Sequence, residues 1–210
     1  LSEAVAKIGS HSWPQRYNKT VKVLFQKVAE ATGKPFDLSD LRPLLKELGS
    51  TARMIGATLQ NTANPTMLDA GYKANVIPQS ASATIDGRFL PGFESELDAT
   101  IREIIGPDIE IETLTRDIAL EVDFEGDLVE AMCNALLTED PEGIPVPYLM
   151  SGGTDNKALS ELGIVGYGFS PLKLPADLDF MSLFHGVDER VPVEGLIFGL
   201  HVLENFLENC

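Results

Sequence analysis

Residues 61–92 read NTANPTMLDAGYKANVIPQSASATIDGRFLPG, and this segment indicates most clearly how the first half of the chain folds. Residues 66–72 are typical of a strand, and the Ile77-Pro78 bond favours an extended or turn geometry before the next element. Apolar and polar side chains alternate from residue 81 to residue 89, as they do on a strand with one buried face. The stretch therefore predicts two successive strands.

The flanking sequence supplies helices and a further strand. Leu97, Ile101, Ile104 and Ile105 form a helical stripe after the two strands, and residues 109–115 alternate again. The order strand, strand, helix, strand indicates an α+β unit, in which helices cover one face of an antiparallel sheet. Before the strands, helical spacing predicts helices over residues 1–9, 20–32, 41–48 (with Asp37 or Ser39 as its N-cap) and 52–60.

After about residue 120 the pattern changes to that of an α/β fold. Two short apolar strands are predicted over residues 144–150 and 164–169, and they favour a parallel or mixed sheet. Helices are predicted over residues 128–137 and 155–162 and at the C-terminal end. The final helix carries one apolar face, which consists of Leu196, Leu200, Leu203 and Phe206 or Leu207.

Composition excludes several classes of protein. The chain has 210 residues and a formal net charge of −16, because 32 acidic side chains outnumber 16 basic ones. Such a chain repels phosphate backbones, so we expect no nucleic-acid partner, and it has no apolar run long enough to predict a membrane span. The only two cysteines, Cys133 and Cys210, lie far apart in the sequence, and neither belongs to a CxxC pair. Their number and spacing exclude a thiolate zinc knuckle and a disulfide scaffold. Since a helical pattern begins at the first residue, Leu1, we expect the chain to be a piece of a longer protein.

The first group of residues with candidate chemistry contains Asn75 and Arg88. A guanidinium binds a carboxylate or an oxyanion through two N–H groups, and an amide side chain donates to the same charge. Asp86 lies two residues before Arg88, on the same strand face, and can pair with it. An exposed ion pair and a turn asparagine explain the same residues without any function.

The other two groups are a glycine loop and a histidine. Gly152, Gly153 and Thr154 lie between a predicted strand and a helix, where glycines let a backbone approach a ligand. A plain glycine turn with a Thr or Asp N-cap is the alternative. His185 lies in a glycine-flanked, acidic stretch with Asp188, where a neutral imidazole suits Zn²⁺ and a carboxylate can orient it. A surface histidine is the alternative there, since one histidine is not a metal site.

Taken in order, these motifs resemble the acetylornithine deacetylase, succinyl-diaminopimelate desuccinylase and aminoacylase family of di-zinc metallopeptidases. The resemblance covers essentially the whole chain and is firmest over residues 61–195. It rests on residues 64–66 (NPT), 71–78 (GYKANVIP), 86–92 (DGRFLPG), 151–155 (SGGTD), 167–171 (YGFSP) and 185–189 (HGVDE).

The resemblance implies a fold of two domains, an α/β catalytic domain of the zinc-aminopeptidase type and a smaller α+β lid that mediates dimerisation. Residues 1–117 match the lid without its first strand, and residues 118–210 match the C-terminal portion of the catalytic domain. The family's His-x-Asp motif and Glu-Glu pair supply most zinc ligands and the general base, and neither is present in this sequence.

The resemblance carries few functional residues over to this chain. His185 matches a zinc-ligating histidine, and Asn75 and Arg88 match the lid pair that holds the substrate carboxylate or the tetrahedral intermediate. Residues 152–154 match the loop that lines the substrate pocket. The implied cofactors are two zinc ions, or cobalt or manganese in their place, which the parent protein binds and this chain alone does not bind tightly.

The implied activity is zinc-dependent hydrolysis of the amide bond of N-acyl amino acids or of short peptides with a free carboxylate. We expect the parent to be a cytoplasmic homodimer that associates through the lid, and we expect the 210-residue chain alone to be inactive. The alternative is a non-catalytic dimerisation or binding module.

Overall fold

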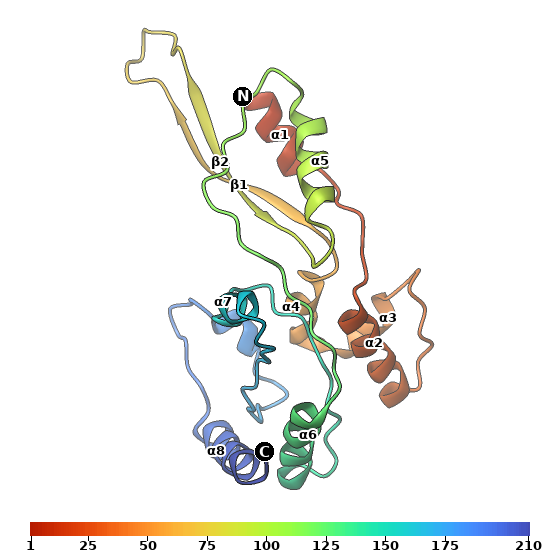
Figure 1. Ribbon diagram of the computed structural model, residues 1–210. Coiled ribbons are helices and arrows are strands. Elements are labelled where there is room, and N and C mark those ends of the chain that lie inside the picture. Colours follow the sequence, from red (N-terminus) through yellow and green to blue (C-terminus); the bar gives the residue numbers. More distant parts are fainter. The chain divides into compact units, whose positions relative to one another are not determined.

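The computed structural model describes all 210 residues, which fold as two compact units. The first unit comprises residues 1–18 and 58–120, and the second comprises residues 19–57 and 121–210. Figure 1 labels their helices and strands along the chain. Each unit is therefore assembled from two separate stretches of sequence.

The first unit is built on a two-stranded antiparallel hairpin. Strand β1 (Thr62–Ala70) pairs with strand β2 (Ala81–Arg88), so that Thr62 lies opposite Arg88. Residues 71–80 connect the strands in a loop that is exposed throughout and extends past the helices in Figure 1. The two predicted strands are confirmed, and β1 begins four residues earlier than expected because its first residues pair with the end of β2.

Two helices cover one face of this hairpin. Helices α1 (Ser2–Ser10) and α5 (Glu94–Ile105) lie side by side on it (Figure 1). The apolar side chains of both helices and both strands meet there, which confirms the predicted antiparallel sheet with helices on one face. The resulting core contains Ile8, Trp13, Ala63 and Leu97, and Ile85, Phe89, Ile101, Ile104 and Ile105 pack against it.

The second unit is helical. Its longest predicted helices are confirmed, because apolar residues at helical spacing bury one side of each, as Val21, Leu24 and Phe25 do in α2. None of the chain's helices combines the length and the apolar character that a membrane span needs. The helices of this unit are α2 (Lys19–Thr32), α3 (Arg42–Glu47), α4 (Ala52–Gly56), α6 (Asp127–Glu139), α7 (Asn156–Glu161) and α8 (Val193–Asn209), with 3₁₀ turns at Gly49–Thr51 and Phe180–Leu183.

The predicted cap of α3 is wrong. Asp37 accepts a hydrogen bond from the backbone N–H of Ser39 at 2.8 Å, which closes a local turn before the helix. Asp40 accepts from the backbone N–H of Arg42 at 3.1 Å, at the first residue of α3. An aspartate forms such local bonds wherever the backbone turns, and sequence spacing does not select among neighbouring candidates.

The final helix buries a different face from the one that its leucines indicate. Gly195, Gly199 and Val202 are its buried residues. A Cβ atom added at Gly199 would overlap the carbonyl oxygen of Pro171, so the backbone of residues 171–173 lies directly against the glycine face of α8. Close backbone contact at glycines therefore decides which side is covered. In the predicted apolar stripe the leucines Leu196, Leu200, Leu203 and Leu207 are exposed, and only Phe206 is half-buried, against Phe169.

Three predicted strands do not form. Residues 109–115, 144–150 and 164–169 contain no strand, and the sheet of the chain has only β1 and β2. A strand exists only when its backbone N–H and C=O groups bond to a neighbouring strand, and none of these segments has such a neighbour among the 210 residues. The α/β sheet expected after residue 120 is therefore absent from this chain.

Candidate functional site

Arg88 lies at the end of β2, on the face of the hairpin opposite α1 and α5. Its Nε donates to the Asp86 carboxylate at 2.8 Å, two residues earlier on the same face. The Arg88 side chain remains 56% exposed, so the ion pair orients the guanidinium without burying it. The predicted pairing of Asp86 with Arg88 is confirmed, and this exposed pair by itself contributes little stability.

A buried asparagine holds the backbone just beyond Arg88. The Asn61 side chain is 1% exposed, and its Oδ1 accepts from the backbone N–H of Leu90 at 2.9 Å. Its Nδ2 donates to the carbonyl oxygen of Phe93 at 3.0 Å. One amide therefore satisfies both a donor and an acceptor of the turn that follows β2, which fixes the strand end that carries Arg88.

Two further side chains brace the same turn. Asn18 donates through Nδ2 to the carbonyl oxygen of Pro91 at 2.9 Å. Arg16 donates through Nε to Glu96 at 3.0 Å, and its guanidinium lies 5.8 Å from the centre of the Phe93 ring. This end of the hairpin is therefore a rigid support, built by residues from before β1 and from the start of α5.

Asn75 lies at the other end of the hairpin. It belongs to the exposed loop of residues 71–80, in which the backbone N–H of Val76 bonds to the carbonyl oxygen of Lys73 at 3.2 Å. Seven residues of β2 separate this loop from Arg88, and a strand rises ~3.3 Å per residue, so the near end of the loop lies about 23 Å from Arg88. Within one chain the structure does not bring Asn75 and Arg88 together.

The glycine loop precedes α7 in the second unit. Gly152, Gly153 and Thr154 are exposed, and Asp155 occupies the N-cap position of α7 without a capping hydrogen bond to its side chain, so the alternative of a plain capped turn is met only in position. A Cβ atom added at Gly153 would meet no atom within 4 Å, and its backbone does not require φ > 0. The packing of this chain therefore gives no reason for glycine at position 153.

His185 has the one positive φ among the residues other than glycine, at 58°. It follows the 3₁₀ turn Phe180–Leu183, and the backbone N–H of Gly186 bonds to the carbonyl oxygen of Leu183 at 2.9 Å. A left-handed conformation at a histidine stores strain, and such strain clusters at functional sites. The imidazole is exposed and has no partner, since Asp188 pairs with Arg190 and not with His185.

The residues of this chain do not by themselves fit a zinc site. A structural or catalytic zinc needs at least three protein ligands. The 210 residues contain no group of three or more His, Cys, Asp or Glu side chains that could hold a metal ion. His185 is therefore a single candidate ligand.

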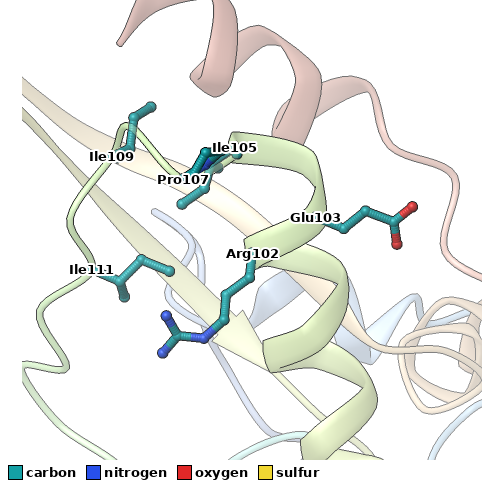
Figure 2. A pocket seen from close by; sticks show the side chains of 7 residues that line it. Arg102, Glu103, Ile105, Pro107, Ile109 and Ile111 are labelled. Atoms are coloured by element: carbon teal, nitrogen blue, oxygen red, sulfur yellow. The ribbon is translucent and has the colours of Figure 1, made fainter.

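A cavity of about 550 Å³ lies in the first unit, between the last turn of α5 and residues 106–111 (Figure 2). Figure 2 shows Ile105, Ile109 and Ile111 around it, with the Arg102 side chain directed toward Ile111 and Glu103 directed away. None of the predicted site residues lines this cavity. The Arg88 site is therefore an open face of the hairpin and not this pocket.

Sequence reasoning missed Asn61, Asn18 and Arg16. A signal for Asn61 was present, because it lies in phase with the buried Leu59 and Ala63 and so points toward the core. Asn18 and Arg16 carried no local signal for this role, since Pro91 and Glu96, which they bond at this end of the hairpin, lie more than 70 residues away along the chain.

Comparison with known proteins places the chain in a family. Residues 1–110 match the family described as a peptidase dimerisation domain. The chain is 27% identical to the probable carboxypeptidase S-like 2 of Dictyostelium discoideum, in a match that covers 98% of the chain and 41% of that protein. It is 26% and 27% identical to the N-fatty-acyl-amino acid synthase/hydrolase PM20D1 of Mus musculus and of Homo sapiens, over 100% of the chain and 44% of each relative.

The chain thus spans about two fifths of the length of these relatives. No solved structure matches it. The match over residues 1–110 agrees with the family that the sequence motifs resemble. The chain belongs to the M20 peptidase family and contains its peptidase dimerisation domain.

Proposed function

We propose that the parent protein is a hydrolase that cleaves the amide bond of N-acyl amino acids or of short peptides with a free carboxylate. One relative is named a probable carboxypeptidase S-like protein and another an N-fatty-acyl-amino acid synthase/hydrolase, and peptides and N-acyl amino acids both hold an amide bond next to a carboxylate. The observation that carries the proposal is Arg88, an exposed guanidinium on a rigid strand end, oriented by Asp86. A guanidinium fits a carboxylate bidentately and anchors it with defined geometry.

We assign Asn75 to a second contact with the substrate. Because about 23 Å of strand separates Arg88 from the near end of the loop that holds Asn75, one small substrate cannot touch both residues of a single chain. A two-fold dimer removes the conflict, since the loop of one copy can supply Asn75 to the site that contains Arg88 of the other. The match to a peptidase dimerisation domain supports a homodimer through residues 1–117, which we propose as the lid.

The zinc requirement is part of the proposal and rests on the family resemblance. His185 would supply one ligand, and the remaining ligands and the general base would come from the parent protein outside these 210 residues. The loop of residues 152–154 would lie against the substrate, which agrees with a glycine at 153 that the chain's own packing does not require. Residues 118–210 would then be the C-terminal portion of a cytoplasmic enzyme's catalytic domain.

Kinetics of Arg88 variants in the full-length parent test the proposal. Arg88→Lys keeps the charge and loses the bidentate fork, whereas Arg88→Ala loses both. A charge-assisted hydrogen bond contributes roughly 1.5–3 kcal/mol, so kcat/KM should fall about ten- to several-hundred-fold, more for alanine than for lysine. Zinc content and melting temperature should stay unchanged, because we expect the lid to contribute no metal ligand and because the ion pair of Arg88 with Asp86 is exposed.

Mixed dimers test the assignment of Asn75. Homodimers of Asn75→Ala and of Arg88→Ala are impaired in both sites, but a mixture of the two should reach about a quarter of wild-type activity, because half of the dimers then hold one complete site. No recovery would show that Asn75 and Arg88 do not act across the dimer. A full-length protein that cleaves no N-acyl amino acid or dipeptide would instead favour the non-catalytic dimerisation module.

A further inference from the structure

The strand register places two polar residues of β1 beside Arg88. Thr62 lies directly opposite Arg88, and Asn64 lies directly opposite Asp86. Directly opposed residues of an antiparallel pair project from the same face, with Cβ atoms roughly 5 Å apart. Thr62, Asn64, Asp86 and Arg88 therefore share the open face of the hairpin, away from the core that Ala63 and Ile85 enter.

Thr62 and Asn64 have no hydrogen-bond partner for their side chains within the chain. The threonine hydroxyl can donate one hydrogen bond, and the asparagine amide can donate two. Asn64 is exposed and Thr62 is half-buried, so both side chains are anchored by the strand while their polar atoms remain accessible. Their donors point out of the same patch as the Arg88 guanidinium.

The charge balance of this patch makes such donors important. The Asp86 carboxylate accepts a hydrogen bond from Arg88 Nε at 2.8 Å, so the ion pair presents little net charge to an approaching anion. A carboxylate drawn by Arg88 also meets the negative charge of Asp86, which weakens the net attraction. Neutral N–H and O–H donors on the opposite strand add hydrogen bonds to the carboxylate without adding further charge.

We propose that Thr62 and Asn64 complete the carboxylate site of Arg88, so that one substrate carboxylate receives hydrogen bonds from both strands of the hairpin. The proposal rests on the proposed function and adds two specificity-determining residues to it. It also separates the roles of the two asparagines: Asn64 belongs to the same carboxylate site as Arg88 in one chain, and Asn75 does not.

Substrate discrimination by the full-length parent tests this proposal. The best substrate from a panel of N-acyl amino acids and dipeptides is compared with its C-terminal amide, which lacks the carboxylate. Asn64→Ala should raise KM for the carboxylate substrate about ten-fold and leave kcat nearly unchanged, because a charge-assisted bond is lost in ground state and transition state alike. Thr62→Val, which preserves shape and strand preference, should raise KM about three-fold.

The amide substrate and a control variant separate binding from folding. Neither substitution should change kcat/KM for the amide, since that substrate has no carboxylate to hold. Ser82→Ala is the matched control, because Ser82 lies on the same face of β2 but opposite Asp69, toward the far end of the hairpin. Ser82→Ala should leave kcat/KM unchanged for both the carboxylate substrate and its amide.

Two results would overturn the proposal. Equal losses on the carboxylate substrate and its amide would show that Thr62 and Asn64 act only on structure. Unchanged kinetics in both variants, with Arg88→Ala still losing its preference for the carboxylate, would show that Arg88 holds the substrate without them. Wild-type protein that cleaves neither substrate class would contradict the proposed function itself, which is a distinct outcome.

Discussion

Asn61 accepts a hydrogen bond at 2.9 Å from the backbone N–H of Leu90, a residue 29 positions later in the sequence. Its amide also donates to the Phe93 carbonyl, so one buried side chain ties the start of β1 to the turn after β2. Arg88 lies two residues before Leu90, and its position therefore depends on a residue that is buried in the core.

Loss of this amide should destabilise the first unit. Asn61→Ala removes two hydrogen bonds and leaves the buried N–H of Leu90 without a partner, so the free energy of unfolding should fall by about 2–4 kcal/mol. Urea unfolding of the 210-residue chain measures the change. Asn134→Ala is the control, because this exposed asparagine lies inside α6, where alanine is the better helix former. A loss below about 0.5 kcal/mol in Asn61→Ala would contradict the assigned role.

The glycine face of α8 gives a second prediction. Gly199→Ala should lower the free energy of unfolding by about 1–3 kcal/mol, because the added Cβ atom overlaps the backbone carbonyl of Pro171, which cannot turn aside as a flexible side chain would. Gly56→Ala is the matched substitution in α4, where no atom lies within 4 Å of the added Cβ. It should be neutral or stabilise by up to about 1 kcal/mol. Equal effects on denaturant midpoints would show that Gly199 is not a close-packing position.

The two thiols should differ in reactivity. Burial raises the pKa of the Cys133 thiol, and the nearby Glu130 raises it further, so Cys133 holds less reactive thiolate at any pH below that pKa. Cys210 is exposed at the C-terminal end. Alkylation with iodoacetamide at about pH 8, followed by mass spectrometry, should modify Cys210 first. The difference should vanish in denaturant, and equal rates in the folded protein would refute the prediction.

Two substitutions separate the backbone role of His185 from the role of its imidazole. Asparagine tolerates a positive φ, so His185→Asn should leave the free energy of unfolding unchanged. A β-branched residue does not tolerate it, so His185→Val should lower that free energy by about 1 kcal/mol. Both variants should reduce the zinc content of the full-length parent, as measured by elemental analysis, if the imidazole is a ligand. Full zinc occupancy in His185→Asn would exclude His185 as a ligand.

Elements whose signal is local could be predicted from the amino-acid sequence alone. Helical periodicity set α1, α2, α5, α6 and α8 to within a few residues, and alternation set β2, because these patterns depend only on neighbours along the chain. The order of the short motifs predicted the family, because each motif is also a pattern of neighbouring residues along the chain. The alternation of β2 also placed Asp86 and Arg88 on one face, since residues two apart on a strand always share a face.

Features that depend on partners far away along the chain could not be predicted from the sequence. Whether residues 109–115 form a strand depends on a neighbour to bond with, and alternation alone does not supply one. The buried face of α8 followed backbone contact at Gly199 and not the leucine stripe. The antiparallel register placed Asn75 far from Arg88 and Asn64 beside it, because pairing fixes which residues of two strands lie opposite each other and sequence proximity does not.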